Sequence, residues 1–188
     1  MFALVQDGSI TKYFSGNQGI TLGDIQYPKQ IFTLWTKSER EAIGIYEVEF
    51  DTTNKKNEEY YINTNVSYAF GSGKVTGSYG SATARPHADT STVRLEGLKT
   101  IKIRIIKQQA AGILRDTDWY IIRKADANTA IPSAITTHRA AVRTKCAEME
   151  TAITNAADTP ALETLYTYTE QEDGSVTRPL GELPTLES

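Results

Sequence analysis

The sequence predicts an α+β protein: an antiparallel β-rich module with short helices, then an antiparallel α-helical hairpin and an extended C-terminal arm. Residues 1–92 contain short apolar runs separated by Gly- and Asn-bearing turns, which is typical of β-strands. Residues 93–157 contain two segments in which apolar side chains recur every three or four positions, which is typical of amphipathic helices. We therefore expect three regions: residues 1–92, residues 93–168, which include a short third helix, and residues 169–188.

The β-rich module begins with a predicted hairpin. Asp7-Gly8 is a strong turn dipeptide and separates the apolar runs 2–6 and 10–13. Further on, Pro28 opens a helical turn that carries Ile31, Leu34 and Trp35 on one face. A helix begins after it, because Thr36-Lys37-Ser38-Glu39 fits a capping box, in which the Thr and Glu side chains bond free amides. We expect that helix to end at Gly44.

Four short strands are predicted after this helix, at residues 45–50, 59–63, 66–70 and 74–79. Gly and Asn mark the turns between them, and Gly71-Ser72-Gly73 joins the last two. Consecutive short strands joined by such turns form an antiparallel meander. Residues 80–92 are small, polar and contain a proline, so we expect a linker there.

The two helices of the hairpin are predicted to bury one apolar stripe each, and residues 116–133 form a polar corner between them. The predicted stripe of the first helix comprises Leu98, Ile101, Ile105, Gln109 and Gly112. The stripe of the second comprises Ile135, His138, Val142, Cys146, Met149, Ile153 and Ala156.

The corner contains residues that are predicted to lock the hairpin. Thr117 and Asp118 have short polar side chains that can bond the free backbone groups where the first helix ends. We expect Trp119 to pack on the seam between the helices, where an aromatic side chain buries a large area. Arg139 and Arg143 can pair with acidic residues of the corner. The predicted lock comprises Thr117, Asp118, Trp119, Tyr120, Pro132, Arg139 and Arg143.

The C-terminal arm follows a last short helix, residues 161–166. Its three leucines, Leu180, Leu183 and Leu186, are spaced by three, with Pro179 and Pro184 between them. That pattern fits an extended or polyproline-like segment that presents one row of leucines. We expect the row to contact a neighbouring subunit. Deletion of residues 174–188 is then predicted to leave the fold intact and to block assembly.

Composition and charge exclude several functions. The net charge is −3 with a pI near 5.5, and Lys and Arg are scattered, so nucleic acid is not a predicted partner. The chain has no apolar run near the about 20 residues that cross a bilayer, so no membrane contact is predicted. Cys146 is the single cysteine, which rules out an intramolecular disulfide and fits a reducing cytoplasm.

No combination of residues predicts an enzyme, a metal site or a cofactor site. His87 and His138 are the only histidines, and they lie far apart in the sequence. A metal site needs three or four convergent ligands. The segment Gly71-Ser72-Gly73-Lys74 lacks the spacing of a phosphate-binding loop and lies between two strands, so we interpret it as a hairpin turn.

In its corner and second helix, the chain resembles the tail-fibre-associated and tail-fibre-assembly proteins of tailed bacteriophages. The matching residues are Leu114, Thr117-Asp118-Trp119-Tyr120, Arg123-Lys124-Ala125, Ala130-Ile131-Pro132 and Arg139-Ala140-Ala141-Val142-Arg143. The run 24–46 also resembles the front module of such proteins. The resemblance covers about half of the chain.

The resemblance implies a role in the virion or in its assembly. The favoured expectation is a structural protein of the tail, baseplate or fibre attachment region, found in the virion and, during assembly, in the host cytoplasm. Its partners would be other phage tail proteins, and it would form a homo-oligomer. One alternative is a tail-fibre assembly chaperone that leaves before maturation. A second alternative is a fibre-tip or surface module that binds a host glycan through exposed tyrosines.

Overall fold

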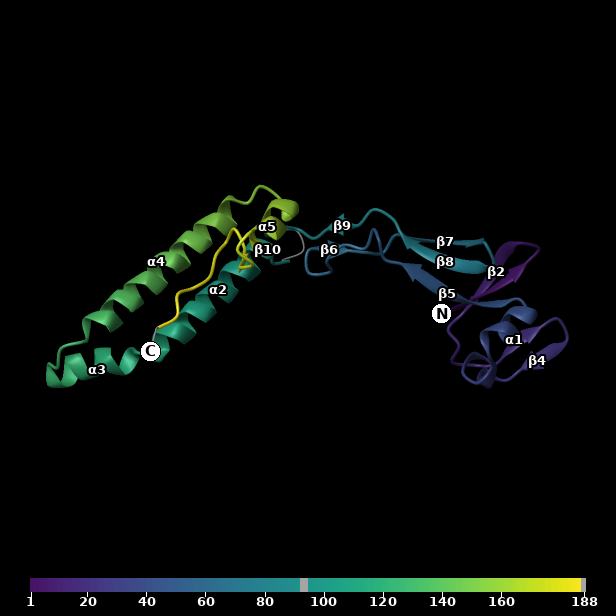
Figure 1. The fold of residues 1–188 in the computed structure, drawn as a ribbon, viewed down its shortest axis with the longest axis horizontal. Coiled ribbons are helices and arrows are strands. Elements are labelled where there is room, and N and C mark those ends of the chain that lie inside the picture. Colours follow the sequence, from purple (N-terminus) through teal and green to yellow (C-terminus); the bar gives the residue numbers. More distant parts are fainter. Residues whose placement is uncertain (92–94, 187–188) are drawn as a thin grey trace. The chain divides into compact units, whose positions relative to one another are not determined.

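The computed structural model describes residues 1–91 and 95–186, and residues 92–94 and 187–188 are outside this description. The chain forms two compact units, residues 1–83 and residues 84–188. The first is a curled mixed β-sheet with short helices, and the second is a helical hairpin with a small β-hairpin (Figure 1). The predicted α+β class is therefore confirmed. The division between the units comes earlier than the predicted one after residue 92.

The sheet of the first unit has five strands in the order β2-β1-β5-β8-β7. The hairpin of β1 and β2 forms as predicted, because Asp7 and Gly8 both adopt positive φ (50° and 73°), as a tight two-residue turn requires. The strands are β1 (Phe2–Gln6), β2 (Ser9–Phe14), β5 (Ile45–Asp51), β7 (Val66–Gly71) and β8 (Lys74–Tyr79).

The prediction of a purely antiparallel meander is wrong, because β5 and β8 pair in parallel. The turn Gly71-Ser72-Gly73 joins β7 and β8 as expected, but it is β8 that lies next to β5. A central position suits β8, because Gly77 has no side chain. A Cβ atom there would lie 3.0 Å from the Tyr68 ring and 3.1 Å from the Phe50 ring. The two rings thus close over Gly77 from the neighbouring strands.

The small elements of the first unit cover the sheet face that carries Phe2, Leu4 and Ile45. They include β3 (Ile20–Leu22), paired with β4 (Ile25–Tyr27), and the single-turn helix η1 (Lys29–Phe32). η1 follows Pro28 as predicted, but Phe32 is buried in place of Leu34, which is exposed. Two further short strands, β6 (Tyr61–Ile62) and β9 (Thr83–Ala84), pair with each other, so the strand predicted at residues 59–63 lies outside the main sheet.

Helix α1 (Lys37–Ala42) has the predicted capping box. The Glu39 amide donates to the Thr36 hydroxyl, and the Thr36 amide donates to the Glu39 carboxylate at 2.8 Å. The backbone amide of Thr36, followed by its hydroxyl, lowers the pKa of Glu39. The helix is followed by Gly44 with φ 79°, which is the predicted glycine end.

Replacing Thr36 with alanine should lower the free energy of unfolding of the first unit by about 1 kcal/mol, as is usual for loss of a side-chain cap. Urea denaturation followed by tryptophan fluorescence measures this. Thr33→Ala is the matched control, because Thr33 is an exposed threonine outside the capping box. An equal loss for the two variants would show that the box contributes nothing.

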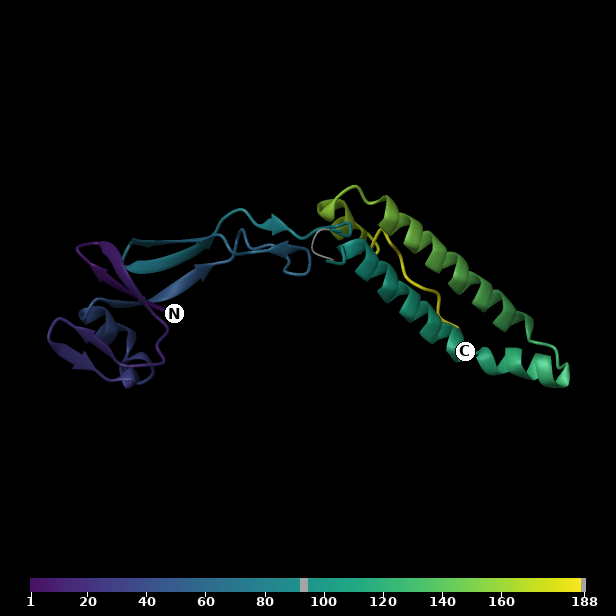
Figure 2. The same ribbon diagram turned by 180° about the vertical axis from the view of Figure 1, so that it is seen from behind.

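The second unit is built on α2 (Leu98–Arg115) and α4 (Ser133–Asn155), which pack together as a hairpin. Figures 1 and 2 show the two helices side by side, with α3 (Asp118–Ala127) at the end where the chain turns from α2 to α4. Helix α5 (Thr159–Tyr166) follows α4, and β10 (Thr169–Glu170) pairs with β11 (Val176–Thr177). No helix in the described part of the chain is long and apolar enough to cross a bilayer.

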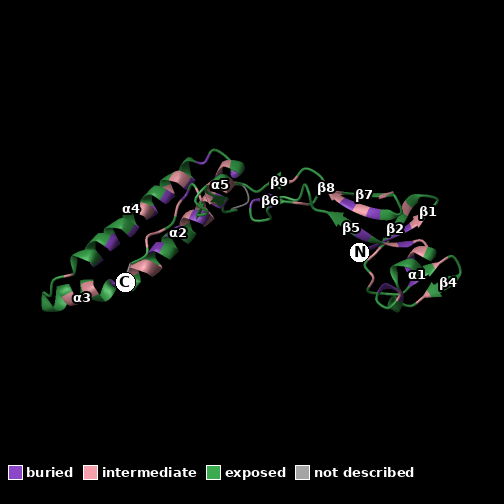
Figure 3. Ribbon diagram, in the orientation of Figure 1, coloured by how far each residue is buried: buried purple, intermediate pink, exposed green. Residues whose placement is uncertain are grey.

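The stripe of α4, together with the residue after it, is confirmed, since all seven predicted residues are buried. Figure 3 colours the ribbon by burial. The stripe of α2 is only partly right. Leu98 is buried as predicted, but the other buried residues, Lys102, Ile106 and Ala110, each lie one position after the predicted Ile101, Ile105 and Gln109, and Ile105 is exposed. The helical period predicted Ile101 and Ile105 in the stripe rather than Lys102. The aliphatic part of a lysine side chain is nevertheless long enough to be buried. The Lys102 ammonium lies 4.2 Å from the centre of the Tyr166 ring, which accommodates its charge.

Candidate functional site

The far end of the helical hairpin is held by one buried arginine. Arg139 is 7% exposed, and its Nη1 donates to the Leu114 carbonyl (2.7 Å) and to the Thr117 hydroxyl (2.6 Å). Its Nη2 pairs with the Asp118 carboxylate at 2.8 Å. The Thr117 hydroxyl itself donates to the Leu114 carbonyl at 3.0 Å, as its predicted capping role requires. One guanidinium therefore joins α4 to the end of α2 and to the start of α3.

The other predicted lock residues have different positions. Arg143 is exposed and donates to the Arg139 carbonyl at 3.4 Å. This backbone bond differs from the predicted pairing of Arg143 with an acidic residue of the corner. Pro132 caps the start of α4, and its carbonyl accepts from the Thr136 amide. Asn128, in the left-handed conformation (φ 51°), ends α3 before this loop.

Helix α3 was missed by the sequence analysis, which placed a polar corner here. None of its residues is buried. The signal was present, because residues 118–127 contain no Gly or Pro and begin with Asp118, whose charge favours a helix N-terminus. α3 exposes three large apolar side chains: Trp119 (49%), Ile121 (42%) and Ile122 (67%).

The prediction that Trp119 packs on the seam between the helices is wrong. Its ring instead lies against Tyr120, with the ring centres 3.8 Å apart. The Arg123 guanidinium lies 4.6 Å from the centre of the Trp119 ring and 5.2 Å from that of Tyr120. We define the exposed cluster of α3 as the exposed Trp119, Ile121 and Ile122 together with the half-buried Tyr120 and Arg123. Aromatic residues and arginine are the types enriched in protein interfaces.

Truncating Trp119 to alanine should change the free energy of unfolding by less than about 1 kcal/mol, since an exposed side chain leaves no cavity. A buried tryptophan would cost about 3 kcal/mol or more. Urea denaturation followed by the helical circular dichroism signal decides between them. A loss in the higher range would mean that Trp119 is packed in solution.

The C-terminal segment 178–186, here called the strap, runs along the helices of its own chain (Figures 1 and 2). Leu180 is 2% exposed, and its amide donates to the Leu165 carbonyl of α5. Leu183 packs against the cluster of Ala110, Val142 and Cys146, which comes from both long helices. The predicted contact arm is therefore corrected: two of its three leucines are used within the chain, and only Leu186 is exposed.

Polar contacts hold the first part of the strap. Arg178 pairs with Glu182 at 2.8 Å, and its guanidinium lies 5.1 Å from the centre of the Tyr168 ring. The Tyr168 hydroxyl donates to Glu182 at 2.6 Å, and this bond raises the pKa of Tyr168. Within the second unit, Gly181 adopts φ 71°, and a Cβ atom there would lie 2.8 Å from the Lys145 ammonium. The positive φ favours glycine at this position, whereas the end of the flexible Lys145 side chain could move away from an added Cβ.

The sequence singled out two histidines and one cysteine as the residues to check for a metal or catalytic site. They contain no cluster of three or more His, Cys, Asp and Glu side chains that could hold a metal ion. His138 is buried in the stripe of α4, away from the loop that carries His87. Burial raises the pKa of the Cys146 thiol, which makes it a poorer nucleophile.

Comparison with known proteins found no match to a family model, to a curated protein or to a solved structure. The residues behind the resemblance to phage tail proteins can nevertheless be placed. Those of the corner and the second helix gather at one end of the hairpin, in the lock around Arg139 and in the exposed cluster of α3, whereas the run 24–46 lies in the first unit. This end is the candidate functional site.

Proposed function

We propose that this chain is a structural protein of a bacteriophage virion, in the tail, baseplate or fibre attachment region, and that it acts through protein–protein contacts. One observation carries the proposal: the Thr-Asp-Trp-Tyr segment that resembles phage tail proteins begins a helix with no buried residue. Thr117 and Asp118 serve the lock, but Trp119 does not serve the core. An exposed helix that presents three large apolar side chains and is tied at its base by the lock fits a contact surface for another tail protein.

Mass spectrometry of purified, mature particles tests the proposal. Peptides of this chain in a fixed ratio to the other tail proteins are the expected result, and the ratio gives the copy number, which must exceed one for the proposed homo-oligomer. Presence only in the lysate of infected cells, with none in the particles, would contradict a virion role.

The contact surface has a test of its own. The double variant Trp119→Ala, Ile122→Ala should stay folded and be lost from particles, because it removes the two most exposed large side chains of α3. Val176→Ala is the control, since Val176 is an exposed apolar residue on β11 and outside α3. Equal incorporation of the two variants would show that α3 is not the contact.

An assembly chaperone is the second candidate, and the position of the strap favours it. An arm pinned on a neighbouring subunit would have supported a virion component, but Leu180 and Leu183 contact their own chain. A protein whose strap packs on its own helices and whose α3 exposes large apolar side chains fits a transient partner as well. The particle experiment separates the two candidates, because a chaperone is absent from mature particles.

A further inference from the structure

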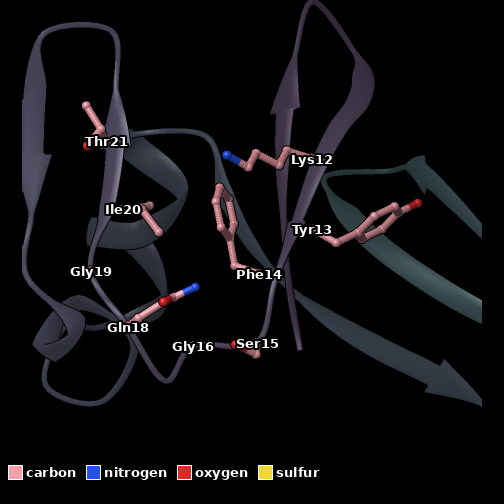
Figure 4. A pocket seen from close by; sticks show the side chains of 9 residues that line it. All are labelled: Lys12, Tyr13, Phe14, Ser15, Gly16, Gln18, Gly19, Ile20 and Thr21. Atoms are coloured by element: carbon pink, nitrogen blue, oxygen red, sulfur yellow. The ribbon is translucent and has the colours of Figure 1, made fainter.

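A pocket of about 380 Å³ lies in the first unit, between the end of β2 and the segment that follows it. Its size falls in the lower part of the range of small-molecule sites. Figure 4 shows the side chains of Lys12, Phe14, Gln18 and Ile20 pointing into the space between β2 and this segment. Tyr13 points away from that space. No acidic residue is among those that line it.

The wall of the pocket is fixed by two glycines. Gly16 adopts φ 82°, and a Cβ atom there would lie 2.9 Å from the Phe2 ring. A Cβ atom on Gly19 would lie 2.8 Å from the Tyr27 carbonyl. The backbone of residues 15–21 is thus pressed against the buried cluster that contains Phe2 and Ile20, so the pocket is formed before any ligand arrives.

The groups that face the pocket are one cation, one amide and one aromatic ring. The Lys12 ammonium lies 5.4 Å from the centre of the Phe14 ring. Among the ion pairs of the described residues, none involves Lys12, and none of their hydrogen bonds uses the Gln18 side chain. The pocket therefore offers a positive charge and an amide beside an apolar surface.

We propose that this pocket binds an acidic monosaccharide unit, such as a uronic acid. The Lys12 ammonium would pair with the carboxylate, the Gln18 amide would bond ring hydroxyls, and the C–H face of the sugar would lie on Phe14. A simple inorganic anion uses only the first of these groups. A neutral sugar offers no charged partner, so the exposed Lys12 ammonium gains no charge-assisted bond from it. This inference is independent of the proposed tail role, since it rests on the first unit alone.

Saturation-transfer difference NMR on the full chain tests the proposal, with D-glucuronate, D-glucose and acetate as probes. Glucuronate should receive saturation at its ring protons, and glucose and acetate should receive far less. Lys12→Gln should weaken glucuronate binding about tenfold, as expected for a charge-assisted bond worth about 1.4 kcal/mol. Gln18→Ala should weaken it to a smaller degree.

Lys56→Gln is the matched control. Lys56 is also an exposed lysine over an aromatic ring, 5.0 Å from the centre of Tyr61, and it does not line the pocket. Lys56→Gln makes the same change in net charge as Lys12→Gln. Glucuronate binding at the wild-type level in Lys56→Gln therefore supports a local role of Lys12. Equal weakening by the two variants would overturn the site, because it would show a general charge effect. Equal signals from glucose would overturn an acidic ligand, and acetate equal to glucuronate would overturn a saccharide.

Discussion

Replacing Arg139 with alanine is expected to lower the free energy of unfolding of the second unit by about 3 kcal/mol. The substitution leaves the Leu114 carbonyl and the Thr117 hydroxyl without their charged donor and leaves Asp118 without its ion pair. Hydrogen bonds to a charged group contribute about 1.5–3 kcal/mol, and breaking a buried ion pair costs about 3–5 kcal/mol. The lower part of that range applies, because the Asp118 side chain is about half exposed.

Urea denaturation followed by helical circular dichroism measures this loss. Two further variants test whether the loss comes from the bonds of Arg139. Arg143→Ala removes an arginine one helical turn away that is exposed and makes a single long backbone bond, so it should cost less than about 0.5 kcal/mol. Arg139→Lys keeps the charge but not the planar fork that reaches Asp118 and Thr117 together. We expect it to restore only part of the loss. An Arg139→Ala protein as stable as Arg143→Ala would show that the lock does not hold the hairpin.

The sequence predicts the elements of this fold better than their partners. Turn chemistry places β1 and β2 through Asp7-Gly8, and the capping box places α1, because these signals act over a few residues. The parallel pairing of β5 with β8 depends on how Phe50 and Tyr68 fit around Gly77 across three strands. No local sequence pattern encodes these contacts between strands, so an antiparallel meander was predicted by default.

Which residues are buried in the second unit is also only partly predictable from local sequence. The stripe of α4 is all apolar but for His138, and its register is unambiguous. In α2, isoleucines occur at 101, 103, 105 and 106, so several registers satisfy the helical period. The choice between them is made by the Tyr166 ring, which accepts the Lys102 ammonium, and this contact joins residues far apart in sequence.

The candidate site was half predictable for a related reason. Arg139, Thr117 and Asp118 could be matched by charge and by helix position, and they do come together. Trp119 was expected in the core because large aromatic residues usually gain most by burial. Its burial needs a facing surface, and α3 turns away from one, since it contains no buried residue. An exposed tryptophan in a helix without a core face is better explained by a partner than by folding.

Deleting residues 178–188, which contain the strap, is expected to lower the free energy of unfolding of the second unit by about 4 kcal/mol, in contrast to the sequence-based expectation of an intact fold. Truncating a buried leucine to alanine costs about 2–5 kcal/mol, and Leu180 is among the most buried residues of the unit. The deletion also uncovers the cluster of Ala110, Val142 and Cys146 where Leu183 packs. The melting temperature of the helical signal reports the loss.

Two point variants separate the role of the strap in folding from a role in contacts. Leu180→Ala should reproduce most of the loss, because its side chain is enclosed, whereas Leu186→Ala should be neutral within about 0.5 kcal/mol, because Leu186 is 46% exposed. A deletion protein that keeps its melting temperature would mean that the strap detaches from its own helices in solution. It would then be free to bind a neighbouring subunit, as the leucine spacing first indicated. The expected loss would instead make Leu186 the one leucine of the row that remains available to a partner, since Leu180 and Leu183 are committed to their own helices.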